Sequence, residues 1–141
     1  RHESWNVPHF YESLIEQGVG FVNIDQPLFK RSIKPSAVVT SPTGYIRVHG
    51  RNYKEWFRED ANVRERYDYL YSPEELAPWA ARTEEIAQHA EDIYVVTNNH
   101  NLGKAAVNAL QLESMLTHER VDAPPPLVAA YPEALEPYVK R

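Results

Sequence analysis

The chain has 141 residues, of which 43% are hydrophobic and 25% charged, and its formal net charge is −5. This is the composition of an ordinary globular domain, and the acidic balance without a basic block argues against a module that binds nucleic acid. The absence of cysteine excludes disulfides, thiolate nucleophiles and cysteine-ligated zinc, and no apolar run reaches the roughly 18 residues of a membrane span. We therefore expect a soluble, cytoplasmic protein.

The first third of the chain predicts one helix and two strands. Asn6 is a residue type that caps helix N-termini, and Gly18 suits the position just after the end of that helix. A strand is expected at residues 19–24, and residues 28–43 carry no regular pattern. The next strand is expected from Tyr45 to His49.

The middle of the chain begins with a long connection. Residues 50–71 are charged and aromatic, which indicates a functional loop or short helical pieces. Ser72 followed by Pro and two Glu is a strong helix start, and an amphipathic helix is predicted over 73–91. Trp79 lies on the apolar face of this helix and is expected in the core; the residues that repeat at helical spacing are Leu76, Trp79, Ala80, Thr83, Ile86, Ala87 and Ala90. A buried strand at 93–97 and a helix at 103–116 complete the pattern.

The order of these elements favours a parallel α/β sheet. Three strands with helices on one side do not close a core, so we expect further strands upstream of this sequence. Residues 1–118 are predicted to form the main domain. Residues 119–141 are rich in proline and are predicted to be an extended or partly ordered C-terminal extension.

Five short motifs in this order resemble one known family. They are RHESW at 1–5, Asp25, YIRVHGRN at 45–52, YDYLY at 67–71 before the Ser72 helix start, and NNH at 98–100. Together they resemble the YecE-like family, also called domain of unknown function 72, over residues 1–116. The resemblance implies a TIM (β/α)8-type barrel of about twice this length, with this chain as its C-terminal half. It implies no particular reaction.

In such a barrel, the residues at the C-terminal ends of the strands converge on one face. Three of them are predicted to be catalytic: Asp25, His49 and His100. Seven more are predicted to bind substrate: His2, Trp5, Arg47, Arg51, Asn52, Asn98 and Asn99. Only one of Asn98 and Asn99 can point inward, and the alternative for this turn is that it caps the following helix.

Arg47 and His49 are two residues apart and therefore share one face of their strand. If the intervening residues pack on helices, both point into the barrel, where Asp25 and Asn23 are the expected partners of Arg47. One interpretation is an Arg that orients an anion beside a His that acts as acid or base. The other is a structural ion pair that fills the barrel centre.

A divalent metal is left open as a cofactor. His2, His49 and His100, with Asp25, are residue types that hold hydrolytic metal ions, although no HxH or HExxH spacing supports such a site. Motifs of dinucleotide-binding folds, P-loop NTPases and α/β-hydrolases are absent from the sequence.

The first hypothesis is a TIM-barrel enzyme that acts on a small anionic or oxygen-rich substrate by hydrolase, lyase or isomerase chemistry. The alternative is a non-catalytic barrel that binds a ligand or a protein partner, with the proline-rich segment making partner contacts. A homo-oligomer is also left open, because this half alone would expose sheet edges and apolar faces.

Overall fold

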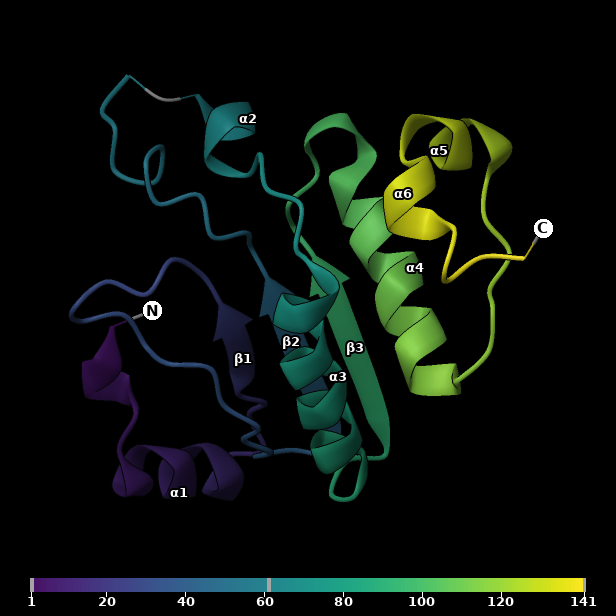
Figure 1. Cartoon of the computed structure of the whole chain (residues 1–141). Coiled ribbons are helices and arrows are strands. Elements are labelled where there is room, and N and C mark those ends of the chain that lie inside the picture. The colour runs from purple at the N-terminus through teal and green to yellow at the C-terminus, as the bar shows by residue number, and fades with distance from the viewer. Residues whose placement is uncertain (1, 61, 141) are drawn as a thin grey trace.

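The protein is a mixed α/β structure built on a three-stranded parallel sheet with strand order β1-β2-β3 (Figure 1). It is a computed structural model that describes residues 2–60 and 62–140, so Arg1, the first residue of the RHESW motif, lies outside the described residues. The elements in chain order are the 3-10 helix η1 (Glu3–Trp5), α1 (Pro8–Glu16), β1 (Val22–Asp25), β2 (Thr43–Val48), α2 (Val63–Arg66), α3 (Pro73–Ala87), β3 (Asp92–Thr97), the 3-10 helix η2 (Asn101–Gly103), α4 (Lys104–Thr117), α5 (Pro125–Ala130) and α6 (Pro132–Leu135).

The two faces of the sheet have different neighbours. Ile46 and Val48 of β2 are fully buried against α3, and both α3 and α4 pack on this side, which we call the helix face. Residues that pair across the sheet point to the same side, so Asp25, which pairs with Val48, also belongs to the helix face. The opposite side carries Tyr45, Arg47, Tyr94 and Val96, and we call it the Arg47 face.

Helix α3 begins where the sequence predicts. The Ser72 hydroxyl accepts a hydrogen bond from the backbone N–H of Glu75, whose carboxylate in turn accepts from the Ser72 N–H, and together they form a capping box. Trp79 on the apolar face of the helix is fully buried, as expected. The main core consists of Ile46, Val48, Tyr71, Leu76, Trp79, Ala80, Ile86 and Leu112.

Two details near the N-terminus differ from the predictions. The N-cap of α1 is Val7, without a side-chain hydrogen bond, so the prediction that Asn6 caps this helix is wrong. Asn6 instead accepts a hydrogen bond from the Tyr11 hydroxyl at 2.6 Å. The first strand ends at Asp25 instead of residue 24, because Asp25 pairs with Val48 in the sheet ladder. Gly18 has the expected positive φ, 65°, just after the helix.

The proline-rich segment is not an extended arm. It forms α5 and α6, which pack beside α4 (Figure 1), and Leu135 and Val139 are buried there with Val107 and Val121. The Tyr131 hydroxyl donates to the backbone oxygen of Leu102 at 2.7 Å, which fastens the segment to the loop after β3. Proline suits the first turn of a helix, so the prolines at the start of α5 and α6 favour these helices.

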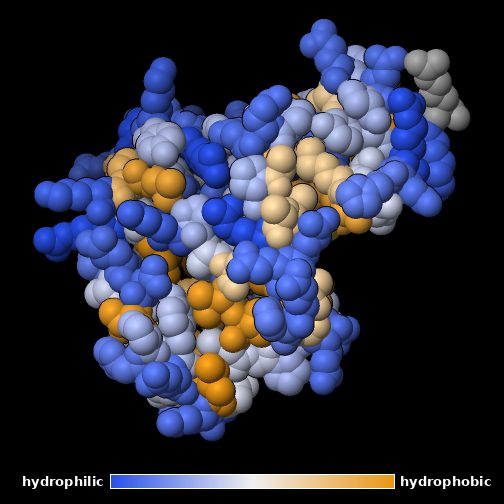
Figure 2. Space-filling model, turned by 60° about the horizontal axis from the view of Figure 1, so that its bottom comes forward, coloured by the Kyte–Doolittle hydropathy of each residue, from blue (hydrophilic) through white to orange (hydrophobic). Residues whose placement is uncertain are grey.

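Large apolar side chains also remain exposed. They include Trp5, Phe57 and Tyr94, which are 53%, 71% and 56% exposed. Figure 2 shows apolar side chains in separate groups between hydrophilic ones on one side of the molecule. None of the helices in the described part of the chain combines the length and apolarity that a membrane crossing requires.

Candidate functional site

The carboxyl ends of the three strands meet at one edge of the sheet. The backbone N–H of His49, just after β2, donates to Asp25 O at 3.0 Å, and that of Asn98, just after β3, donates to Val48 O at 2.7 Å. Parallel pairing thus brings the candidate residues of three strand ends to one place, with their side chains divided between the helix face and the Arg47 face.

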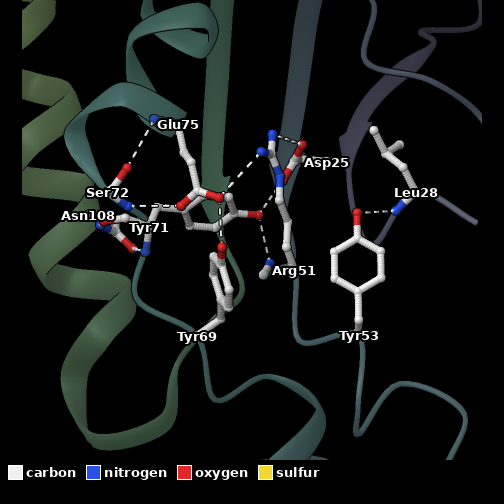
Figure 3. Close-up of polar contacts among 10 residues, drawn as sticks. Asp25, Leu28, Arg51, Tyr53, Tyr69, Tyr71, Ser72, Glu75 and Asn108 are labelled. Carbon is white, nitrogen blue, oxygen red and sulfur yellow. Dashed lines mark hydrogen bonds and ion pairs between the residues drawn. The ribbon is translucent and has the colours of Figure 1, made fainter.

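Asp25 is the centre of a buried cluster on the helix face. Its side chain is fully buried, and Arg51 binds it through two parallel hydrogen bonds of 2.8 and 2.9 Å (Figure 3). The Tyr71 hydroxyl donates to the same carboxylate at 2.5 Å and accepts the backbone N–H of Gly50 at 2.8 Å. Both Asp25 oxygens therefore have protein partners, and Asp25 has no contact with solvent.

The third nitrogen of the Arg51 guanidinium, Nη1, lies 3.4 Å from Glu75 Oε1. The same Glu75 oxygen accepts the Tyr69 hydroxyl at 2.6 Å, so the capping box of α3 is joined to the Asp25 cluster (Figure 3). Arg51, predicted to bind substrate, thus has a carboxylate partner at Nε, Nη1 and Nη2. Three of these site residues, Tyr69, Tyr71 and Glu75, were not predicted from the sequence. The alternating YDYLY motif contains the two tyrosines, and the capping box contains Glu75, so these two patterns were the signals that could have identified them.

The pKa shifts follow from this cluster. The hydrogen bonds to Asp25 raise the pKa of the Arg51 guanidinium. Burial, followed by the negative charge of Asp25, raises the pKa of the Tyr71 hydroxyl above its usual value. The pKa of Tyr69 is raised by burial and by its hydrogen bond to Glu75. At neutral pH, both hydroxyls therefore stay protonated and act as hydrogen-bond donors to carboxylates.

Gly50 forms the turn that places Arg51. Its φ is +90°, and a Cβ added there would lie 2.8 Å from Tyr69 Cβ. Both the backbone conformation and the space therefore require glycine at this position.

Arg47 lies on the other face of the sheet, and the prediction that it pairs with Asp25 or Asn23 is wrong. Asn23 pairs across the sheet with Ile46, and Asp25 with Val48, so both side chains point away from the Arg47 face. Arg47 Nε instead donates to Asn98 Oδ1 at 3.0 Å. Among residues 2–60 and 62–140, none of the ion pairs includes Arg47.

Aromatic rings connect the two histidines at the strand ends. The Tyr67 ring lies between His49 and His100, with centroid distances of 6.0 and 5.7 Å, and the edge of Trp56 contacts Tyr67 at 5.9 Å. His49 is 2% exposed, whereas His100 is exposed and its Nδ1 lies 2.9 Å from Asn98 O. Tyr67 was not predicted as a site residue.

The side chains of the two asparagines after β3 point to different partners. Asn98 Oδ1 accepts a hydrogen bond from Arg47 Nε. Asn99 is fully buried, and its Nδ2 donates to Tyr69 O and to Asn108 Oδ1, both at 2.7 Å. The Asn108 side chain also holds the backbone of Tyr71. Its Oδ1 accepts the Tyr71 N–H and its Nδ2 donates to Tyr71 O, both at 3.1 Å. Buried amides of this kind fix loop geometry, because each unmade hydrogen bond would be costly.

The remaining predicted residues lie around this region. Asn52 Nδ2 donates to the backbone oxygens of Glu65 and Asp68, which fixes the loop between β2 and α3. His2 Nδ1 accepts from Ser4 N–H as the cap of η1, and the His2 side chain lines a cavity of about 330 Å³ together with Trp56. Trp5 contacts Phe10 edge-on, with centroids 4.7 Å apart, beside α1.

A metal site with the suggested ligands is not assembled by the described residues. Among residues 2–60 and 62–140, no three His, Asp or Glu side chains come close enough together to hold an ion. Asp68, in the YDYLY motif, instead forms an ion pair with Lys104, which lowers the pKa of Asp68.

Comparison with known proteins identifies relatives. The family model described as "Protein of unknown function DUF72" matches residues 1–131, beyond the range 1–116 expected from the motifs and into α5. The UPF0759 protein YunF of Bacillus subtilis is 32% identical over an alignment of 128 positions, and the match covers 84% of this chain and 45% of that protein.

Two solved structures are similar in sequence and in shape. A DUF72 family protein from Thermotoga maritima is 40% identical with a TM-score of 0.76, and the match covers 83% of this chain and 44% of that one. A DUF72 family protein from Enterococcus faecalis is 30% identical with a TM-score of 0.71, covering 89% of this chain and 48% of that one. The chain spans a little under half the length of the relatives it matches.

Proposed function

The chain belongs to the DUF72 family, and from that premise we propose that it binds a small anionic or oxygen-rich substrate at the carboxyl ends of its strands. The observation that carries the proposal is the set of partners of the Arg47 guanidinium. Its guanidinium is held by a neutral amide at Nε alone, and none of the ion pairs in the described part of the chain includes it. An unpaired guanidinium fork matches the geometry of a carboxylate or phosphate.

We propose further that residues 1–118 are the C-terminal half of a TIM (β/α)8-type barrel, and residues 119–141 an extension of it. The parallel sheet, with α3 between β2 and β3 and α4 after β3 on the same face, supports this architecture, although no helix separates β1 from β2. The matched relatives are also about twice as long as this chain. The Arg47 face would then be turned toward the barrel interior, and the strand ends toward the mouth where active sites of such barrels lie.

In this site, each polar residue has a separate task. Arg47 orients the anion, and His49 and His100, on either side of Tyr67, are the proton-transfer groups. Asp25 serves as a positioning residue, because its carboxylate is saturated by Arg51 and Tyr71 and is fully buried. Through its backbone oxygen it also holds the N–H of His49. Hydrolase, lyase and isomerase reactions can all use such a set.

The test is calorimetric titration of the purified protein with inorganic phosphate and, separately, with acetate. Arg47→Met should weaken binding of the anion by about tenfold or more, because a charge-assisted hydrogen bond is lost. Arg120→Met is the matched control, since Arg120 is an exposed residue after α4 whose loss removes the same charge elsewhere.

Equal losses in the two variants would show that only net charge matters and would contradict the proposal. A wild-type protein that binds neither anion at millimolar concentration would contradict it as well. Binding that depends on Arg47 but leads to no turnover of phosphate or carboxylate esters would favour the alternative of a non-catalytic ligand-binding barrel.

A further inference from the structure

The cavity that His2 and Trp56 line has no role in the proposed function. It has a volume of about 330 Å³, and its other lining residues are Gln26, Phe29, Arg31 and Ser32, after β1, and Phe57, in the loop after β2. Cavities of this volume are of the size that small-molecule ligands occupy in proteins.

Aromatic side chains form the walls of this cavity. Phe29, Trp56 and Phe57 line it, and the rings of Phe29 and Phe57 are 4.6 Å apart with an interplanar angle of 53°. Phe29 also contacts the ring of Tyr53 at 5.5 Å. Phe57 is 71% exposed, so one face of its ring is open to a ligand in the cavity.

The loop that carries Phe29 is held in place by local hydrogen bonds. The backbone N–H of Phe29 donates to Ser32 Oγ at 3.1 Å, and that hydroxyl donates to Pro27 O at 3.2 Å. The Leu28 N–H donates to the Tyr53 hydroxyl at 3.1 Å, which joins this loop to the one after β2 (Figure 3). The aromatic walls therefore belong to two loops that are tied together before any ligand arrives.

The charged side chain at the cavity is basic. Arg31 lines it, no acidic side chain is among its lining residues, and none of the described ion pairs includes Arg31. A planar ring that carries negative charge is therefore favoured over a cationic ring.

Ring contacts connect the cavity to one of the two histidines. Trp56 lines the cavity, and its ring centroid lies 5.9 Å from that of Tyr67, which in turn lies 6.0 Å from that of His49. The cavity is thus separated from His49 by the Trp56 and Tyr67 rings.

We propose that this cavity binds the planar aromatic part of the substrate, so that the substrate class is an aromatic ring bearing a phosphate or carboxylate group. The inference rests on the proposed function, in which Arg47 holds the anionic group. The ring packs against Phe29, Trp56 and Phe57, and Arg31 at the cavity favours a substrate that carries negative charge.

The experiment compares phenyl phosphate, cyclohexyl phosphate and inorganic phosphate by calorimetric titration of the purified protein. Phenyl phosphate should bind about tenfold more tightly than inorganic phosphate, with cyclohexyl phosphate between them, because a flat ring fits between aromatic walls. Phe57→Ala should remove most of the advantage of phenyl phosphate and leave the affinity for inorganic phosphate unchanged. Since Phe57 is exposed, the variant should fold normally.

Two controls separate the possible failures. Leu102→Ala removes another exposed apolar side chain, 75% exposed, and should change neither affinity. Arg47→Met should weaken the binding of all three compounds. Equal affinities of the wild-type protein for phenyl and inorganic phosphate, or an equal loss of both in Phe57→Ala, would overturn the aromatic cavity and leave the anion site standing. Absence of binding to all three compounds would overturn both.

Discussion

Arg47 and Arg51 are four residues apart in one motif, yet they face opposite environments. Arg51 reaches the helix face, where Asp25 and Glu75 occupy its guanidinium. Arg47 lies on the other face, where its side chain bonds the amide of Asn98 and, among the described residues, no carboxylate. Two arginines at one strand end thus differ in their partners because they lie on opposite faces of the sheet.

The energetic consequences of losing each arginine should differ. Asp25 is fully buried, so its charge depends on Arg51, and removal of one partner leaves a buried charge uncompensated. Arg47 is only partly buried and lacks a carboxylate partner among the described residues, so its loss leaves no stranded charge. Stability measurements can therefore sharpen the contrast or break it.

The largest effect is expected from Arg51→Met. The variant should lose about 3–5 kcal/mol of unfolding free energy, because the Asp25 carboxylate stays buried but no longer has a positively charged partner. Urea unfolding followed by circular dichroism measures this loss. Arg47→Met, unfolded in the same way, should change stability by about 1 kcal/mol or less.

A double variant, Asp25→Leu with Arg51→Met, refines this test. Its loss should be smaller than the sum of the two single losses, since no buried charge remains unpaired. Similar losses for Arg47→Met and Arg51→Met would break the comparison and make Arg47 a structural residue as well.

An intermediate effect is expected at alkaline pH, through Tyr71. Folding raises the pKa of its hydroxyl above the ordinary 10.0, mainly by burial and then by the charge of Asp25. The folded state therefore holds this proton more tightly than the unfolded state, so the resulting stability is complete below about pH 10 and is lost as pH rises above it. Urea unfolding at several pH values between 8 and 11 should show this decline.

Tyr71→Phe should lower stability at pH 8 by about 1–3 kcal/mol and should flatten the alkaline decline. Tyr94→Phe is the control, because Tyr94 is 56% exposed and lies on the Arg47 face, away from Asp25. An alkaline decline of the same steepness in Tyr71→Phe and in the wild-type protein would show that other groups cause it.

The smallest effect is expected from Asn98→Ala, which removes the amide that holds Arg47 Nε. Without this partner the guanidinium is less well oriented, and affinity for inorganic phosphate should fall by a few fold, equivalent to about 0.5–1.5 kcal/mol. Stability should change little. Asn101→Ala, in the same loop, serves as the comparison, and an equal affinity in Asn98→Ala and wild type would remove Asn98 from the site.

Much of the local structure could be predicted because its causes are local. The Ser72 capping box, the positive φ after α1 and the burial of Trp79 follow from residue types at fixed spacing. The partner of Arg47 could not be predicted in this way. It depends on the register between β1 and β2, and a shift of one residue moves Asp25 to the other face.

The C-terminal segment shows the same limit. Its prolines suggested an extended arm, because composition alone does not reveal a packing surface. That surface is supplied by α4, against which Leu135 and Val139 are buried, and Gln111 Nε2 donates to the backbone oxygen of Ala134 at 2.9 Å. Three prolines then stand in the first turns of two short helices.

By itself the sequence determined the order of the main strands and helices up to α4, the start of α3 and the strand ends where polar residues gather. Periodicity, caps and glycines are properties of neighbouring residues, so they can be recognised without coordinates. Only the tertiary structure decided which face each strand-end side chain occupies, and therefore that Asp25 holds Arg51 while Arg47 bonds the amide of Asn98. Pairing between segments twenty or more residues apart sets that choice, and no local pattern encodes it.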